Sequence, residues 1–224
     1  MVPQQTQQQD FQEILQKEVL QPLLNFYNKY QNIIIAIAGS LLLITVLAVI
    51  TITRTNQIQK RNWEKIAMAQ AYLYKKMYNE GFKLLDEIIS TSKNSQYTSY
   101  ALYTKATFLI NNGDFATGKE LCTKILEIKK SKSLIPHTLY LLGLCYQNLA
   151  DTKNAIGTYN DFISKYPSHY LTPRVYESLA LVYQSIGDIE NAKNTYDKLN
   201  ILYPGSYWSA LAQKKLSLLQ QTKK

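Results

Sequence analysis

The residues best suited to chemistry in this sequence are two histidines, His137 and His169, and two cysteines, Cys122 and Cys145. A histidine acts as a general base, and a cysteine as a nucleophile, when a partner side chain lies within hydrogen-bonding distance. The histidines stand 32 residues apart, which matches no metal-ligand spacing, and neither has a serine or cysteine at a spacing that indicates a catalytic pair. The sequence also lacks a glycine-rich phosphate loop and a His-Glu-x-x-His motif. We therefore expect a protein that is not an enzyme and that binds no metal or cofactor.

The cysteines and the charges exclude further classes of protein. Two cysteines are too few for a small disulfide-stapled fold, and burial as small hydrophobes, pairing and reactivity all remain open for them. The net charge is +9, but the densest basic cluster, between Lys124 and Lys132, fits the solvated C-terminal end of a helix. Because no continuous basic stripe runs along the chain, we expect no nucleic-acid binding.

An uncharged apolar segment, "IIIAIAGSLLLITVLAVITI" (Ile33–Ile52), lies near the N-terminus. Helical residues that rise about 1.5 Å each carry a segment of this length across about 30 Å, the hydrocarbon thickness of a bilayer. Tyr27 and Tyr30 stand where an interfacial aromatic belt would lie. A secretory signal peptide fits less well, because 32 residues precede the segment and no small-x-small cleavage site follows it. We expect one membrane-spanning helix over residues 33–53 and a linker over residues 54–61.

Residues 1–32 combine a polar tail with a juxtamembrane segment. Apolar residues recur at roughly helical spacing from Phe11 to Tyr27, and Pro22 would either kink that helix or start a second one. The segment is either an amphipathic helix that binds the membrane or a protein, or a plain spacer. Ala36 and Ser40 form a small-xxx-small pair, which is weak support for helix association, so a homo-oligomer stays open.

Most of the remaining chain repeats itself. The stretch "ADTKNAIGTYNDFISKYP" (Ala150–Pro167) returns 37 residues later as "GDIENAKNTYDKLNILYP" (Gly187–Pro204), and the same register holds in four copies between residues 62 and 206. A period between about 20 and 50 residues is typical of a solenoid of stacked helix pairs. Within the copies, Asp114, Asp151 and Asp188 are placed to cap a second helix. Small residues recur where the two helices of a pair would cross, at Gly143, Ala155, Ala180 and Ala192.

These positions resemble the tetratricopeptide repeat. The family pattern of a small residue, Tyr, Ala, an aromatic residue and Pro appears as Gly143, Tyr146, Ala155, Tyr159 and Pro167. The resemblance implies an all-α fold, in which a single N-terminal transmembrane helix precedes an α-solenoid of about four helix hairpins and a C-terminal capping helix. We expect hairpins over residues 62–95, 99–132, 136–169 and 173–206, and the capping helix and tail over 207–224.

The same resemblance implies a binding surface. In tetratricopeptide repeats the first helix of each pair lines a concave channel that receives extended peptides or partner helices. Aromatic and amide side chains predominate at the corresponding positions here, which suits apolar or β-prone peptide segments. The expected groove residues are Trp63, Ile66, Tyr100, Tyr103, His137, Tyr140, Leu144, Gln147, Arg174, Glu177, Leu181 and Gln184.

Two features of the sequence conflict over the side of the membrane on which the repeats lie. The positive-inside rule favours cytoplasmic repeats, because fewer basic residues precede the apolar segment than follow it: Lys17 and Lys29, then Arg54, Lys60, Arg61 and Lys65. The chain pattern, with "SYALYTKATFLINNGDFATGKEL" (Ser99–Leu121), instead resembles the YfgM-type ancillary subunits of the bacterial SecYEG translocon. That resemblance implies periplasmic repeats that contact emerging chains and periplasmic chaperones.

A second stretch, "ISKYPSHYLTPRVYESLALVY" (Ile163–Tyr183), resembles CpoB and BamD-like envelope repeat proteins. We follow the resemblance and expect a single-pass inner-membrane protein with a cytoplasmic N-terminus and periplasmic repeats, while the opposite topology stays open. The first functional hypothesis is a protein–protein interaction module that binds translocon subunits, nascent envelope proteins or periplasmic chaperones. The alternative is a scaffold subunit of a fixed membrane complex that binds no client.

Overall fold

The structure, a computed structural model, describes residues 15–93 and 95–221, so the polar tail expected at the N-terminus lies outside the described residues. Within those ranges every regular element is a helix, beginning with a short π-helix, η1 (Leu15–Leu20). The α-helices that follow are α2 (Gln21–Tyr74), α3 (Tyr78–Thr91), α4 (Gln96–Asn111), α5 (Phe115–Ile128), α6 (Leu134–Asn148), α7 (Thr152–Lys165), α8 (Thr172–Ser185), α9 (Ile189–Leu202) and α10 (Tyr207–Gln221). The chain divides into two compact units between Lys60 and Arg61.

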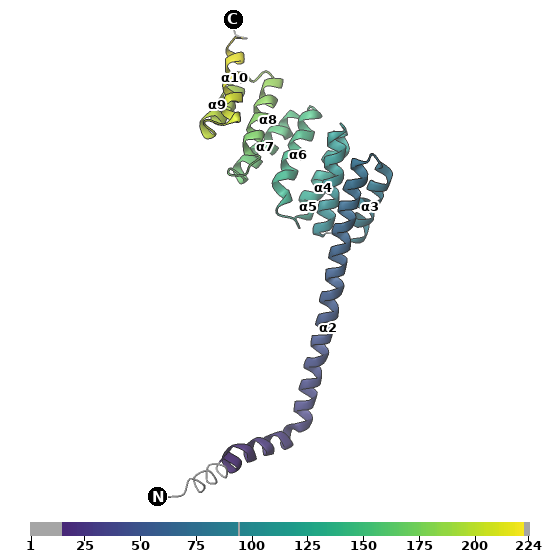
Figure 1. The fold of residues 1–224 in the computed structure, drawn as a ribbon. Coiled ribbons are helices and arrows are strands. Elements are labelled where there is room, and N and C mark those ends of the chain that lie inside the picture. Colours follow the sequence, from purple (N-terminus) through teal and green to yellow (C-terminus); the bar gives the residue numbers. More distant parts are fainter. Residues whose placement is uncertain (1–14, 94, 222–224) are drawn as a thin grey trace, which may run out of the picture. The chain divides into compact units, whose positions relative to one another are not determined.

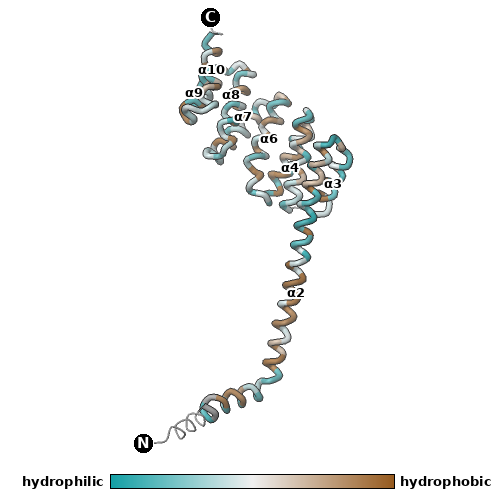
Figure 2. Tube along the Cα trace, viewed as in Figure 1, coloured by the Kyte–Doolittle hydropathy of each residue, from teal (hydrophilic) through white to brown (hydrophobic). Residues whose placement is uncertain are grey.

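The N-terminal unit is dominated by the apolar part of α2, the brown stretch in Figure 2. Its exposed large apolar side chains range from 43% exposed at Ile50 to 66% at Leu42. Pro22 is the second residue of α2 and follows η1 directly, so the helix changes from π to α next to a residue that lacks an N–H donor. Residues 54–61, expected to form a linker, continue α2 as helix.

Hydroxyl groups in this part of α2 are satisfied by the helix itself. Ser40 and Thr45 donate to the carbonyl oxygens of Ile37 and Leu42, both at 2.8 Å. Thr51 donates to the carbonyl oxygen of Leu47 at 2.7 Å. A hydroxyl that bonds back to its own helix needs neither water nor a neighbouring helix, which is what a hydrocarbon environment demands.

The C-terminal unit is a row of helix pairs. The last turns of α2 pack with α3, and the pairs α4–α5, α6–α7 and α8–α9 follow in order, with α10 closing the row (Figure 1). The expected all-α solenoid of four hairpins and a capping helix is confirmed for the residues described.

The turns within the pairs follow the expected capping chemistry. Asp114, Asp151 and Asp188 each stand at the N-cap of a second helix. Their carboxylates accept hydrogen bonds from backbone amides three residues on, at 3.0, 3.3 and 3.1 Å respectively. The first pair differs, because Met77 stands at the N-cap of α3 and offers no side-chain hydrogen bond.

Small residues let the helices of each pair approach closely, as the sequence pattern indicates. Ala155, Ala180 and Ala192 have no exposed surface. A Cβ built on Gly143 would lie 2.4 Å from the ring of Tyr159 in the partner helix, and one on Gly118 would lie 2.4 Å from Ile110. Larger residues at these crossings would push the helices apart.

The core runs through the whole row without interruption. Four clusters of buried residues each belong to neighbouring helices, and half-buried side chains join one cluster to the next. Ile89 joins the first two clusters along the chain, Tyr140 the second and third, and Tyr183 the third and fourth. Each pair therefore depends on its neighbour to bury its apolar face.

Candidate protein-binding surface

The first helices of the pairs lie next to one another along one side of the row. Helix α4 contacts α6, α6 contacts α8 and α8 contacts α10, whereas the second helices α3, α5, α7 and α9 do not contact each other in the part of the chain described. We call the solvent-facing side of the last turns of α2 with α4, α6 and α8 the first-helix surface. Closer spacing of the first helices makes this the inner side of the row.

Eleven of the twelve expected groove residues are exposed or half-buried, and one is buried. Ile66 is only 4% exposed and belongs to the core cluster with Leu85 and Ala101, so its expected place in a groove is wrong. An aliphatic side chain at this boundary packs inward, whereas a tyrosine keeps its hydroxyl in water. Trp63 and Arg174 are exposed, and the other expected groove residues are half-buried: Tyr100, Tyr103, His137, Tyr140, Leu144, Gln147, Glu177, Leu181 and Gln184.

Aromatic rings connect the first two repeats on this surface. The ring of Trp63 meets those of Tyr97 and Tyr100 edge to face, with centroids 5.4 and 4.8 Å apart. The Tyr100 hydroxyl lies 3.3 Å from the Ser133 hydroxyl just before α6. These contacts fix the orientation of two large rings whose remaining surface faces water, so they can offer contact area at low entropic cost.

The structure brings together the two histidines that the sequence left apart. The ring centroids of His137 and His169 lie 5.2 Å apart, and the ring of Tyr170 packs against both. His137 Nδ1 lies 3.0 Å from the Ser133 carbonyl oxygen, so this nitrogen carries the proton. In this tautomer the other ring nitrogen accepts a hydrogen bond from the Tyr170 hydroxyl at 2.7 Å.

The contact between His137 and Tyr170 recurs at a fixed separation along the repeats, so it could have been predicted from the sequence. His137 and Tyr170 are 33 residues apart, the same separation as Tyr100 and Ser133. Each pair links a residue early in one first helix to the segment just before the next first helix. Tyr170, which is 70% exposed, was missed because it precedes the helix and so falls outside the family's groove positions.

The two glutamines on the surface are partly engaged with the core. Gln147 accepts a hydrogen bond from the Tyr159 hydroxyl at 3.0 Å, and Gln184 accepts one from the Tyr196 hydroxyl at 2.9 Å. Both tyrosines are fully buried, and burial raises the pKa of Tyr196 to about 12 because it disfavours the phenolate. Both glutamines are half-buried, so each side chain reaches from the core to the surface.

The cysteines pack in the core and not on the surface. Cys122 on α5 and Cys145 on α6 are both free, fully buried and part of one cluster. The hydrogen bond with Cys145 and burial raise the pKa of the Cys122 thiol, which keeps it protonated. Among the described residues, no group of three or more His, Cys, Asp or Glu side chains could hold a metal ion.

Two parts of the chain match a family model. Residues 137–169 and residues 173–201 each match a model of the tetratricopeptide repeat. Both helix pairs are therefore similar to tetratricopeptide repeats. They are the α6–α7 and α8–α9 pairs, in which the sequence pattern is most regular. No curated protein sequence matches the chain.

Solved structures with similar folds extend the likeness to the earlier pairs. MamA 41-end from Desulfovibrio magneticus RS-1 is 19% identical with a TM-score of 0.59, over 72% of this chain and 85% of that one. A putative kinesin light chain with nearly identical TPR-like repeats, from Podosopora anserina, is 15% identical with a TM-score of 0.59, over 73% and 87%. At these identities the similarity shows the fold alone, which is a solenoid of stacked helix pairs.

Proposed function

We propose that the chain is a membrane-anchored protein–protein interaction module of the bacterial cell envelope, whose first-helix surface binds extended polypeptide segments. The observation that carries the proposal is the ring-linked set of aromatic side chains along the first helices, interleaved with amide groups. Aromatic faces supply contact area to apolar side chains, and amides pair with the backbone of an extended chain.

Anchoring is supported by the first part of α2. By length and composition, α2 is long and apolar enough to cross a membrane, and none of its most apolar window is buried within the chain. A signal sequence would meet the same criteria of length and composition. The back-bonded hydroxyls of Ser40, Thr45 and Thr51 favour the anchor, since they leave no side-chain donor that needs water.

The repeats would lie in the periplasm and the N-terminus in the cytoplasm, as in the YfgM-type translocon subunits that the chain resembles. Partners of that kind include translocon subunits, nascent envelope proteins and periplasmic chaperones. The basic residues that follow the apolar segment favour the opposite topology. Accessibility of a single introduced cysteine at exposed Lys153 to a membrane-impermeant reagent distinguishes the two.

The binding surface can be tested by site-specific photo-crosslinking in the full chain. A benzophenone side chain at Leu181 would lie on the first-helix surface, and one at Tyr170 would lie beside it, next to His137. One at Lys153 on a second helix would serve as the matched control. The probe is a permanently unfolded polypeptide, reduced and carboxymethylated lactalbumin. We expect crosslinks from Leu181 and Tyr170 and none from Lys153.

A binding measurement with the same probe completes the test. Leu181 is half-buried but belongs to no core cluster, so Leu181→Ala should weaken binding by roughly 1–2 kcal/mol and leave the melting temperature unchanged. Tyr103 and Tyr140 are less suitable, because both also pack against the core. Crosslinking from Lys153 alone would overturn the first-helix surface, and absence of any crosslink would favour the scaffold without client binding.

A further inference from the structure

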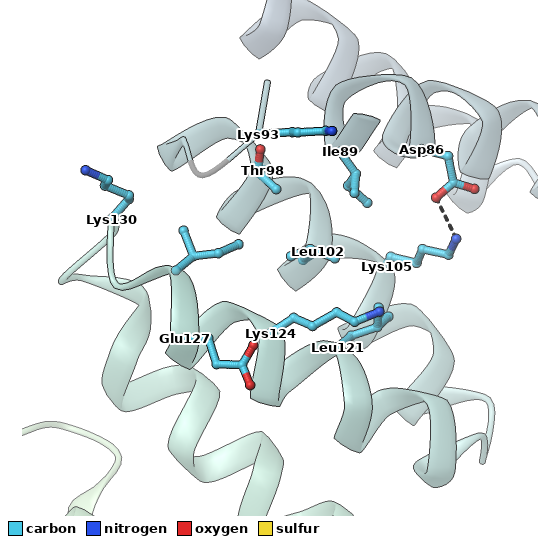
Figure 3. Close-up of a pocket in the computed structure, with 11 residues that line it drawn as sticks. Asp86, Ile89, Lys93, Thr98, Leu102, Lys105, Leu121, Lys124, Glu127 and Lys130 are labelled. Atoms are coloured by element: carbon cyan, nitrogen blue, oxygen red, sulfur yellow. Dashed lines mark hydrogen bonds and ion pairs between the residues drawn. The ribbon is translucent and has the colours of Figure 1, made fainter. Parts of the chain in front are cut away.

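A second groove lies on the other side of the helix row, away from the first-helix surface. It has a volume of about 580 Å³ and runs between α3 and α5, with α4 beneath (Figure 3). Its apolar lining consists of Ile89 from α3, Leu102 from α4, and Leu121 and Ile128 from α5. These side chains form a floor that can receive the apolar side chains of a ligand.

The rim of this groove carries an excess of unpaired positive charge. Lys93, Lys124 and Lys130 line it, and none of them has a carboxylate within 4.0 Å among the described residues. Glu127 is the unpaired carboxylate that faces them. The fourth lysine, Lys105, is already committed to another partner, since it pairs with Asp86 at 2.7 Å. Three free cations against one free anion favour a ligand with negative charge.

The equivalent groove two repeats later lacks this character. It lies between α7 and α9 over α8 and has a volume of about 370 Å³. Asn160 stands there in the place of Asp86, Leu179 in the place of Lys105, and Ile201 in the place of Glu127. Lys198 keeps the place of Lys124, but Asp197 beside it offsets its charge. Both grooves therefore result from the stacking of the repeats. Of the two, only the α3–α5 groove has a basic rim.

We propose that the α3–α5 groove binds an acidic peptide segment of a partner protein. Leucine-like side chains of the segment would pack on the apolar floor, and its carboxylates would lie against Lys93, Lys124 and Lys130. An apolar floor does not suit nucleic acid, and the carboxylates of Asp86 and Glu127 repel a phosphate-rich ligand. The site shares α4 with the first-helix surface but uses none of the side chains expected to line that surface, so it stands or fails independently of the function proposed above.

The test measures the affinity of the full chain, in a nonionic detergent, for a fluorescein-labelled peptide of repeating Glu-Leu-Leu-Asp. Its uncharged counterpart is a peptide of repeating Gln-Leu-Leu-Asn. The variant is Lys93→Gln with Lys124→Gln, and the matched control is Lys198→Gln in the equivalent groove. We expect the double variant to raise the Kd for the acidic peptide by roughly 2- to 30-fold, the range for two exposed ion pairs. The control should leave the Kd unchanged.

Each outcome decides the proposal. Tighter binding of the acidic peptide than of the uncharged one, lost in the double variant and at high salt, supports it. Equal binding of the two peptides overturns it, and so does an equal loss in Lys198→Gln. Binding of a short-chain phosphatidylglycerol that depends on Lys93 and Lys124, without binding of the acidic peptide, would assign the groove to lipid and also overturn it. All the lysines are exposed or half-buried surface residues, so equal melting temperatures confirm that the variants remain folded.

Discussion

Tyr196 and Gln184 show how one hydrogen bond links the core to the first-helix surface. The Tyr196 hydroxyl is buried with its ring and has the Gln184 side-chain oxygen as its partner at 2.9 Å. Tyr159 and Gln147 repeat the arrangement one repeat earlier. In the first two repeats the corresponding residues are apolar, Leu85 with Leu73 and Cys122 with Ile110. The buried hydroxyl and its glutamine partner are therefore present together or absent together. A buried hydroxyl without a partner would cost more than the bond contributes.

This pairing predicts a non-additive pair of substitutions. Gln184→Leu should lower the free energy of unfolding by about 1–3 kcal/mol, because it leaves the Tyr196 hydroxyl buried and unpaired. Adding Tyr196→Phe should restore most of the loss, since both partners are then apolar. Denaturant unfolding of the two single variants and the double variant measures the coupling. Additive losses would mean that the hydroxyl finds another partner.

We expect His169 to make the stability of the protein depend on pH. Burial lowers its pKa below the ordinary value, and the neighbouring His137 lowers it further. The unfolded chain therefore binds more protons than the folded chain once the pH falls below about 6.5, the unperturbed pKa of histidine. Stability should be full above that value and should fall as the pH is lowered toward the folded-state pKa.

The measurement compares melting temperatures between about pH 7.5 and about pH 5.5, a window in which histidine is the main side chain to titrate. His169→Asn is the matched variant, because its side-chain oxygen can accept the hydrogen bond that Leu171 N–H donates to His169 Nδ1 at 3.2 Å. Its melting temperature should fall less on acidification than that of the wild type. Parallel curves for the two proteins would contradict the assignment to His169.

At the scale of elements, alanine substitutions at two glycines of one helix pair should have opposite effects on stability. Gly143 on α6 faces the ring of Tyr159, whereas a Cβ on Gly157 of α7 would meet no atom within 4 Å. Gly143→Ala should destabilise the protein by roughly 1–3 kcal/mol, because a rigid ring must move. Gly157→Ala should stabilise it by roughly 0.5–1 kcal/mol, because alanine restricts the unfolded chain and favours helix. Thermal unfolding of both variants tests the helix crossing, and a stabilised Gly143→Ala would disprove it.

The features that the sequence predicts well are those set within one helix pair. The caps at Asp114, Asp151 and Asp188 depend on residues three apart, and the crossing at Gly143 depends on a partner in the same hairpin. Contacts between pairs are harder, because they depend on how one repeat stacks on the next. The meeting of His137 with His169 and Tyr170 is of this kind, and so is the inward turn of Ile66.

The surface grooves were harder still to predict. The lysines between residues 124 and 132 are compatible with a solvated helix end when only the sequence is known. Two of them, Lys124 and Lys130, line a groove only together with Ile89 of α3, Lys93 of the following turn and Leu102 of α4. Side chains from three separate segments form one surface only after the repeats have stacked.

At the scale of the whole molecule, the two units have opposite relations to water. The N-terminal unit exposes apolar side chains on every side of α2 from Ile33 to Ile52, and nothing in the described chain covers them. The C-terminal unit buries its apolar side chains in one continuous core and ends with α10, whose Ala212 and Leu219 pack on the last cluster. The first unit leaves its apolar side chains uncovered by the described chain, whereas the second covers its own.

This division predicts that residues 56–224 form a soluble protein without detergent, whereas the full chain requires it. The fragment keeps Asn62 and its hydrogen bond to Ser92, and it begins at Asn56, a residue type favoured at a helix N-cap. It should show a helical circular dichroism spectrum and a single cooperative thermal transition, because shared residues such as Ile89 and Tyr183 couple neighbouring clusters. Size-exclusion chromatography and circular dichroism of the fragment, beside the full chain in detergent, provide the measurement. Aggregation of the fragment would mean that the repeats rely on the first part of α2 for their core, and the separation of anchor and binding module would then be wrong.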